Sequence, residues 1–299
     1  MAQVELKQVC KQVDGKPALR EVSWHSRHPV VGVLGCAGAG KTTLLRLLAG
    51  KTEADGGQVA LFGLNLAEHR ADIAGRVALM SAQGTHCGAL TVREALLLAA
   101  SGCGMSPAQA EAAAVEVLEF FDLGAHAGRR LAALGRGLLQ RSRLAEAVVA
   151  RPRLLLVDDP AALLAARERA HLLCLLTEVP ARFHCSLILA SRHLADIERV
   201  CAQVMVLAEG KVLYSGAVAS LVAPEEGLYA VHIQGDRQDF ATALHAQGCV
   251  FTDNTTHFEV RLPRGACADS LFAVAARAQV QVRHIAPMTR TLTRAFVPC

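Results

Sequence analysis

Hydrophobic and polar positions change their spacing several times along this chain. The first thirty residues alternate as strands do, on either side of a turn at Asp14-Gly15. A short apolar run over 30–34 follows and ends in glycine, and leucines in helical register then occupy 42–49. This order predicts two strands joined by a turn, and then a strand, a glycine-rich loop and a helix.

The chain continues to alternate between these two spacings up to about residue 210. Continuous apolar runs are typical of strands that are buried on both faces. Strands that alternate with helices predict a parallel sheet of the α/β class. The predicted elements are a strand, a short helix and a strand over 53–83, helices over 91–150, a strand at 154–157, a helix to about 176, a strand at 187–190, a helix to 200 and a strand at 204–207.

A change of pattern near Pro224-Glu225-Glu226-Gly227 predicts a boundary between two domains. The larger domain spans 1–223 and the smaller one spans 228–299. In the smaller domain the predicted order is strand, helix, two strands, helix and strand, a βαββαβ-like arrangement typical of a small α+β domain. The predicted ranges are 229–233, 237–246, 249–253, 257–262, 266–278 and 280–284.

The composition of the 299 residues narrows the class of protein. Apolar residues make up 52% of the chain, which excludes a disordered protein. Aromatic residues make up only 4%, which counts against a base-stacking platform for nucleic acid. The ten cysteines lack the spacing of a zinc site and are typical of the reduced thiols of a cytosolic protein. No segment reaches the roughly 18 uncharged apolar residues that would span a membrane.

The glycine-rich segment has the spacing GxxxxGK[ST]. Glycines let the backbone fold its N–H groups around phosphate oxygens, and the following helix adds the positive end of its dipole. Lys41 is expected to reach the outer phosphates, and the Thr42 hydroxyl is expected to bind Mg²⁺. A bare glycine-rich turn is the alternative, but the strand before it and the helix after it favour a nucleotide site. The residues assigned to this site are Gly35, Cys36, Ala37, Gly38, Ala39, Gly40, Lys41, Thr42 and Thr43.

Asp158 follows directly on the apolar run over 154–157. In P-loop proteins a carboxylate in this position, on a neighbouring strand, binds the metal directly or through water. Such a residue by itself is more often only the end of a strand. Together with the glycine-rich segment it predicts a metal site that includes Thr42 and Asp158.

From about residue 3 to 222 the order of these motifs resembles that of the nucleotide-binding subunit of an ABC transporter. Residues 77–83 are similar to the strand that leads to the family's Q-loop glutamine, and residues 90–96 are similar to its LTVRENL helix start. Asp158-Asp159-Pro160 stands in place of the family's DEP, and Ser191-Arg192-His193 stands where the family has a switch histidine.

This resemblance implies a P-loop NTPase fold of the ABC-ATPase type, with a helical subdomain at about 84–150. The implied ligands are ATP and Mg²⁺, with Gln83 as a ligand of the metal that also senses the γ-phosphate. Asp159 occupies the position of the catalytic glutamate. His193 is the second implied catalytic residue and donates to the γ-phosphate, with a capping or core histidine as the alternative. The tip at 83–88 is the candidate contact for a membrane partner.

The chain departs from the family pattern at several places. Leu134-Gly135-Arg136-Gly137-Leu138 aligns with the signature LSGGQ, so a serine hydroxyl is lost and a cation stands where backbone approaches the nucleotide. Asp159 is one methylene shorter than glutamate, and a displacement near 1 Å can cost about 100-fold in rate. Residues 161–165 lack the aspartate of SGLD, and Val13 replaces the aromatic residue that stacks on adenine. This combination predicts ATP binding with slow hydrolysis.

The resemblance also implies partners and a location. Sites in this family form between two subunits, so a second ATP-binding subunit is expected, either the same chain or a related one. A polytopic membrane subunit is the other expected partner, and it would hold the chain at the inner face of the cell membrane from the cytoplasmic side. Residues 285–297 weakly resemble the tail of exporter ATPases, which favours export. No nucleic acid is expected as a partner.

Two other functions stay open at this point. One is a non-hydrolysing, ATP-dependent scaffold or regulatory subunit of such a complex. The other is a soluble ABC ATPase that acts on nucleic acid or the ribosome, against which the lack of basic clusters counts. The contacts that select a transported substrate belong to the membrane subunit and are not encoded in this chain.

Overall fold

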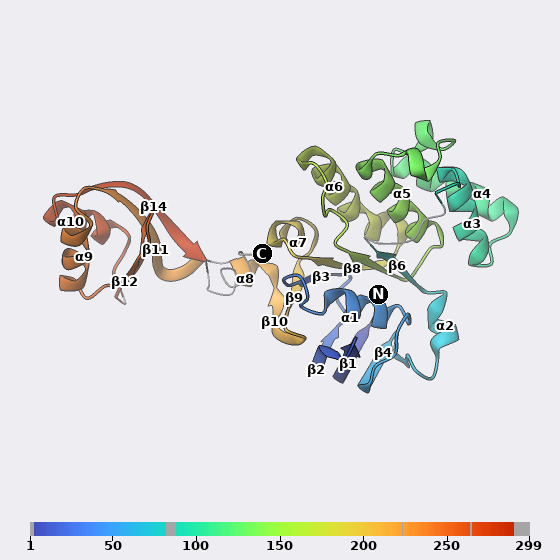
Figure 1. Ribbon diagram of the computed structural model, residues 1–299, viewed down its shortest axis with the longest axis horizontal. Coiled ribbons are helices and arrows are strands. Elements are labelled where there is room, and N and C mark those ends of the chain that lie inside the picture. The colour runs from blue at the N-terminus through green and yellow to red at the C-terminus, as the bar shows by residue number, and fades with distance from the viewer. Residues whose placement is uncertain (1–2, 82–87, 223, 264, 290–299) are drawn as a thin grey trace. The chain divides into compact units, whose positions relative to one another are not determined.

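The computed structural model of the protein describes residues 3–81, 88–222, 224–263 and 265–289. The backbone forms two compact units, one that ends at Val218 and one that begins at Ala219. Their helices and strands are labelled in Figure 1. Within the described ranges, no helix has both the length and the hydrophobicity needed to cross a membrane.

The N-terminal part of the first unit contains an antiparallel sheet of four strands. These are β1 (Val4–Val13), β2 (Lys16–Ser26), β4 (Gly56–Leu61) and β5 (Leu64–Asn65), in the order β2-β1-β4-β5. The first two strands form the hairpin that the alternating pattern predicts, and its turn places Val13 opposite Lys16. Inward side chains such as Leu6 and Trp24 are buried, which is why this pattern alternates.

The central sheet of the first unit has six strands. These are β3 (Val30–Leu34), β6 (Val77–Ser81), β7 (Leu154–Asp158), β8 (Ser186–Ser191), β9 (Gln203–Ala208) and β10 (Lys211–Ala217). Their order is β10-β9-β3-β8-β7-β6, and all neighbours are parallel except β10, which is antiparallel to β9. Every residue of β7 and β8 is buried, as expected for central strands of a parallel sheet.

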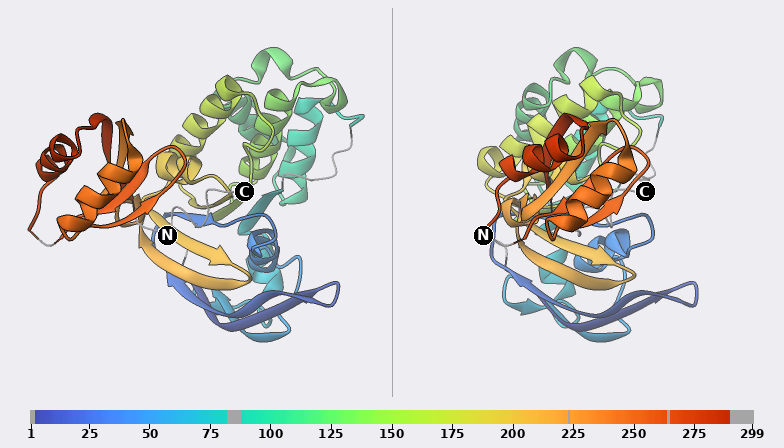
Figure 2. Two further views of the ribbon diagram at one scale, coloured as in Figure 1. Left: turned by 60° about the vertical axis from the view of Figure 1, so that its left-hand side comes forward. Right: turned by 90° about the vertical axis from the view of Figure 1, so that its left-hand side faces the viewer.

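Helix α1 (Lys41–Leu48) packs against both sheets. Its four leucines are buried in one core cluster with Leu6 of β1, Val33 of β3 and Leu156 of β7. The start of the helix is thereby fixed at the carboxyl end of β3. Figure 2 shows β9 and β10 running beside the β1–β2 hairpin, with which β10 is in contact.

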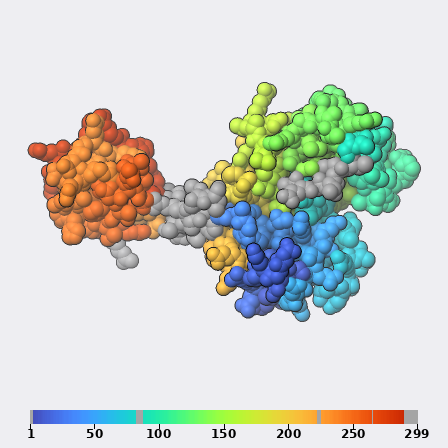
Figure 3. All heavy atoms as spheres, viewed as in Figure 1, coloured from blue at the N-terminus to red at the C-terminus, as the bar shows by residue number. Residues whose placement is uncertain are grey.

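A helical segment follows the short helix α2 (Arg70–Ala74) and the strand β6. It contains α3 (Val92–Gly102), α4 (Pro107–Phe120), two 3₁₀ turns at 124–126 and 131–133, and α5 (Arg136–Val149). Thr91 and Ser106 close capping boxes with Glu94 and Gln109, so polar signals fix the start of the first two helices. In Figure 3 the green atoms of this segment gather at one end of the first unit and the blue atoms of β1 and β2 at the other.

Helix α6 (Ala166–Phe183) is longer than its apolar pattern predicts, and an end near residue 176 is wrong. Pro180 lies within the helix and removes one backbone hydrogen bond from it. The ring of Phe183 is buried and stacks on that of Phe121, with 6.3 Å between the ring centroids. This packing holds the last turn in place despite the proline. Helix α7 (Leu194–Val200) belongs to the first unit, and the short helix α8 (Val218–Val222) begins at the last residue of that unit and continues into the second.

The second unit is a four-stranded antiparallel sheet with two helices. Its elements are β11 (Pro224–Gln234), α9 (Arg237–Ala246), β12 (Val250–Asp253), β13 (Phe258–Arg261), α10 (Asp269–Arg277) and β14 (Gln281–Thr289). The strands lie in the order β12-β13-β11-β14. The strands of the first half of this unit, β11 and β12, therefore alternate with those of its second half, β13 and β14, as in a split βαβ arrangement. Figure 1 shows both helices on the same side of the sheet, where Phe240, Leu244, Phe258 and Leu271 form one core.

Candidate functional site

A loop over residues 35–40 joins β3 to α1 at the carboxyl end of the strand. Gly40 has a φ of 102°, and a Cβ at this position would lie 2.4 Å from the backbone oxygen of Ala18. A Cβ at Gly35 would lie 2.3 Å from the backbone oxygen of Leu207. Both positions therefore require glycine, and the spacing of the motif is a steric requirement of this loop. Because α1 begins directly after the loop, its first N–H groups face the same space.

The ammonium of Lys41 lies inside this loop. Its Nζ atom donates to the backbone oxygens of Gly35 at 2.5 Å and Cys36 at 2.8 Å. Burial lowers the pKa of the Lys41 ammonium, and the nearby carboxylates of Asp159 and Asp158 oppose this change. Backbone carbonyls are neutral acceptors, so an anion that entered the loop would offer the ammonium stronger ones.

Asp158, at the end of β7, meets Thr42, which lies 116 positions earlier in the chain. The hydroxyl of Thr42 donates to Oδ2 of Asp158 over 2.7 Å, and the Asp158 side chain is buried. A hydroxyl and a carboxylate oxygen are the hard donors that Mg²⁺ prefers. The donor set of this pair therefore fits a divalent cation.

Asp159 is the first residue after β7. Its backbone φ of 44° is a left-handed conformation that aspartate adopts more readily than most residues. Its backbone N–H donates to the oxygen of Ala190 on the neighbouring strand β8, over 2.9 Å. Its Oδ2 atom lies 3.5 Å from Nε of Arg192, and its Oδ1 atom is buried without a hydrogen-bond partner among the described residues. Burial raises the pKa of the Asp159 carboxyl, and the positive charges of Arg192 and Lys41 oppose this rise.

His193 lies just after the end of β8 and caps α7. The hydroxyl of Ser191 accepts from the backbone N–H of His193 at 3.0 Å and donates to Asp196 at 2.9 Å. Arg169 of α6 forms an ion pair with the same Asp196 at 2.7 Å. These contacts fix the turn, and His193 lies close enough to Asp159 to oppose the rise in the pKa of that carboxyl.

The segment that aligns with the ABC signature lies at the start of α5. Gly135 is the N-cap residue, and a Cβ at this position would meet nothing within 4 Å. Arg136 is the first residue of the helix and is exposed. Gly137 is buried, and a Cβ there would lie 2.4 Å from Oε1 of Glu168 on α6. The first two positions are thus open, and a side chain at the third would require only that the exposed Glu168 side chain rotate.

An open pocket of about 460 Å³ at the carboxyl end of β3 gathers most of the assigned groups. The assigned residues that line it are Ala37, Gly38, Ala39, Gly40, Lys41, Thr42, Thr43, Asp158 and Asp159. Arg46, Ser81 and Arg192 also line the pocket, and the motifs assign none of them. The sequence contains a signal that could have placed Arg192 in the pocket, because this charged residue stands between an apolar strand and the histidine assigned to the site.

Five assigned positions are not among the residues that line this pocket in the described part of the chain. Gly35 and Cys36 belong to the loop, and their backbone oxygens accept from Lys41. Gln83 and the rest of the tip up to residue 87 lie outside the described residues. Val13 lies at the turn of the β1–β2 hairpin and is 44% exposed. His193 lies beside the pocket, next to Arg192.

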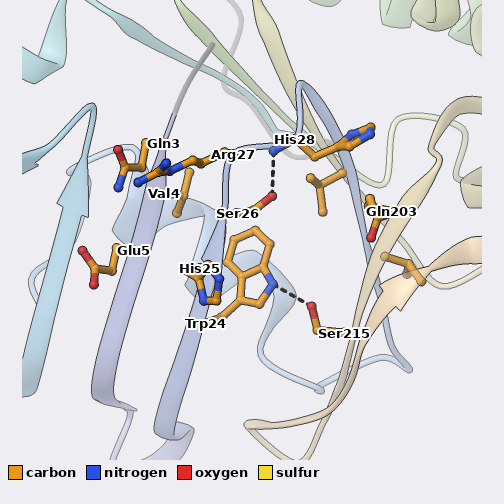
Figure 4. Close-up of a pocket in the computed structure, with 12 residues that line it drawn as sticks. Gln3, Val4, Glu5, Trp24, His25, Ser26, Arg27, His28, Gln203 and Ser215 are labelled. Carbon is orange, nitrogen blue, oxygen red and sulfur yellow. Dashed lines mark hydrogen bonds between the residues drawn. The ribbon is translucent and has the colours of Figure 1, made fainter.

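A second pocket, of about 540 Å³, lies where β3 and β9 begin, at the opposite end of these strands. Figure 4 shows the indole N–H of Trp24 donating to the hydroxyl of Ser215 there, over 3.0 Å. Among the described residues that line this pocket there is neither a glycine-rich loop nor a carboxylate pair. The chemistry of the lining residues, rather than the volume, therefore makes the other pocket the candidate phosphate site.

Comparison with known proteins gives the family. A family model described as ABC transporter matches residues 19–162. Nod factor export ATP-binding protein I of Paraburkholderia xenovorans (strain LB400) is 32% identical over 235 residues, which cover 78% of this chain and 77% of that protein.

Two solved structures have the same fold. An ATP-binding subunit of an ABC transporter is 23% identical with a TM-score of 0.64, covering 90% of this chain and 98% of its own. A dimeric ATP-binding cassette in a post-hydrolysis state, bound to ADP and Pi, is 20% identical with a TM-score of 0.65, covering 72% of this chain and 98% of its own. These matches confirm the P-loop fold of the ABC-ATPase type. The chain belongs to the ABC transporter family as an ATP-binding subunit, an ABC-type ATPase.

Proposed function

We propose that this chain binds Mg-ATP in the pocket at the carboxyl end of β3 and couples nucleotide-driven dimerisation to a separate polytopic membrane subunit. The observation that supports the binding step is the meeting of the buried Lys41 ammonium and the Thr42–Asp158 pair around one glycine-lined pocket. Phosphate oxygens would replace the carbonyls of Gly35 and Cys36 as acceptors for Lys41.

Calorimetric titration of the purified chain with ATP and MgCl₂ tests this proposal. Saturable heat at one nucleotide per chain is expected. A folded chain that takes up no nucleotide at millimolar concentration would contradict it.

The bound cation is proposed to be Mg²⁺, with the Thr42 hydroxyl, the Asp158 carboxylate and Gln83 as its protein ligands. When bound, the cation would neutralise charge on the outer phosphates. The Asp158 side chain and the Thr42 hydroxyl already point at one another over 2.7 Å, so little rearrangement is needed to share a cation. Titration with ATP in EDTA is the matched control, and weaker binding is expected there.

We also propose that two ATP-binding subunits complete each other's sites. The solved cassette bound to ADP and Pi is dimeric, which supports this arrangement. In a homodimer both sites would combine Asp159 with the altered segment at 135–137. With an intact related subunit, each composite site would contain one of the two departures. Sedimentation of the purified chain with and without Mg-ATP measures whether it dimerises alone.

Hydrolysis is proposed to be slow, with phosphate release below about 1 s⁻¹, the low end for ordinary enzymes. Asp159 is one methylene shorter than glutamate, so its carboxylate is set back from the position at which the family's glutamate would activate water. Replacing Asp159 with glutamate is expected to raise turnover about tenfold. This is less than the roughly 100-fold that restored reach alone could give, because the left-handed backbone here suits glutamate less well.

Steady-state phosphate release measures this effect, with Asp159→Asn as the matched control that keeps the size and removes the carboxylate. An unchanged rate in Asp159→Glu would mean that the segment at 135–137 or a missing partner limits turnover. No measurable hydrolysis in either protein, with ATP still bound, would favour the ATP-dependent scaffold over the energising subunit.

Val13 is proposed to lie where adenine binds. Replacing it with tyrosine is expected to tighten both ATP and ADP binding about tenfold, because base–aromatic stacking contributes about 1–3 kcal/mol. The position is 44% exposed, so the ring needs no space in the core. Val13→Leu is the matched control without a ring. Equal affinity in both variants would show that adenine lies elsewhere.

The membrane partner is proposed to be an exporter subunit at the inner face of the cell membrane. The ATP-binding relative at 32% identity is named for Nod factor export, which supports this direction without identifying the substrate. Purification of the tagged chain from detergent-solubilised membranes, followed by mass spectrometry, tests the partner. A polytopic membrane protein is expected, and ribosomal RNA in its place would contradict the proposal.

A further inference from the structure

Arg192 lies in the nucleotide pocket, although no motif assigns it there. It follows Ser191, the last residue of β8, and β7 pairs along its whole length with β8, so that Asp158 lies opposite Ala190. This pairing brings Arg192 to the same edge of the sheet as Asp158 and Asp159. The side chain lines the pocket together with Lys41, Thr42 and Asp159.

The contact between Arg192 and Asp159 is close but incomplete. The Nε atom of Arg192 lies 3.5 Å from Oδ2 of Asp159, which is within reach of a charge pair and at the limit of a hydrogen bond. Both Nε of Arg192 and Oδ1 of Asp159 are buried without a hydrogen-bond partner in the described part of the chain. Buried polar groups in native proteins are nearly always paired. These two atoms are therefore a donor and an acceptor that a bound molecule can satisfy.

The charges in the pocket indicate which molecule would do so. Three cations and two carboxylates line the pocket, so one net positive charge remains before a nucleotide binds. The cations are Lys41, Arg46 and Arg192, and the carboxylates are Asp158 and Asp159. A triphosphate adds several negative charges, and the ammonium of Lys41 is one point charge inside the loop. A guanidinium presents a planar fork of donors that matches phosphate oxygens. Arg192 is the cation of the pocket that approaches it from β8, on the side of Asp159.

We propose that Arg192 makes this pocket select nucleoside triphosphates over diphosphates. In the nucleotide-free chain its guanidinium lies against Asp159, and in the ATP-bound chain it donates to the γ-phosphate. ADP lacks that phosphate and leaves the pair in place. The inference rests on the proposed function, because it requires nucleotide to bind in this pocket.

The test compares the affinities for Mg-ATP and Mg-ADP in the full chain and in Arg192→Ser, by calorimetric titration. The variant is expected to bind ATP about tenfold more weakly and ADP within twofold of the original chain, since a hydrogen bond to a charged group is lost only in the first case. Arg199→Ser is the matched control, because Arg199 is an exposed arginine on α7. It is expected to change neither affinity.

A second variant removes the competing partner. Asp159→Ala frees Arg192 and is expected to tighten ATP binding several-fold without changing ADP binding. If Arg192 only holds Asp159 in place, each variant would change the affinities for ATP and ADP by the same factor. That result would overturn the inference. If the original chain binds neither nucleotide, the proposed function fails instead, and the two failures are distinguished by this first measurement.

Discussion

Replacing Lys41 with alanine is expected to weaken Mg-ATP binding at least about 100-fold. The ammonium donates to two backbone oxygens in the loop, and a phosphate would take over these donors as charge-assisted hydrogen bonds of about 1.5–3 kcal/mol each. Since about 1.4 kcal/mol corresponds to a tenfold change in affinity, the loss of two such bonds accounts for the effect. Calorimetric titration of both proteins with Mg-ATP is the measurement.

The fold should survive this change. The core of α1 is made by its leucines, whereas the Lys41 ammonium bonds to Gly35 and Cys36 of the loop. Lys51→Ala is the matched control, because Lys51 is an exposed lysine shortly after the end of the same helix. Equal affinity in Lys41→Ala and Lys51→Ala, with unchanged circular dichroism, would exclude the glycine-rich loop as the phosphate site.

Replacing Phe240 with alanine is expected to destabilise the second unit by about 3–5 kcal/mol and leave ATP binding unchanged. Phe240 is completely buried, and its ring meets that of Phe258 edge to face with 5.2 Å between centroids. A loss of this size approaches the whole stability of a small domain. Urea denaturation followed by circular dichroism, together with limited proteolysis, would detect the selective loss of this unit.

Phe272→Ala is the matched control on the same unit, because Phe272 is 55% exposed on α10. It is expected to change stability by less than about 0.5 kcal/mol, as surface substitutions usually do. The proposed division into domains 1–223 and 228–299 requires that the two units unfold separately. A single transition that shifts as a whole in Phe240→Ala, with ATP affinity falling in parallel, would contradict that division.

The fold class and the phosphate-binding loop can be predicted because their signals are local. Backbone oxygens approach positions 35 and 40 so closely that a side chain does not fit there, and both residues must be glycine. The motif is therefore visible in the sequence. The buried strands β7 and β8 appear as uninterrupted apolar runs for an equally direct reason. The assigned roles of Asp158 and His193 stay predictions, although the first lies in the pocket and the second beside it.

The remaining features depend on segments that are distant in the sequence. Arg192 reaches Asp159 because β7 and β8 are neighbours in the sheet, although the 18-residue helix α6 separates them in the chain. The end of α6 also depends on a distant residue, since the ring of Phe121 stacks on that of Phe183 and stabilises the helix beyond Pro180. Periodicity within a short window carries no information about such contacts.

The geometry at the start of α5 bears on how this chain evolves. A Cβ at 137 would lie 2.4 Å from Oε1 of Glu168, but this carboxylate is the end of a flexible and exposed side chain that can rotate away. Position 135 has empty space around it, so exchange of serine for glycine there is nearly neutral for the fold and is restrained only by demand for turnover. The fold therefore tolerates exchange at both positions, so only a demand for turnover would keep the family's residues there.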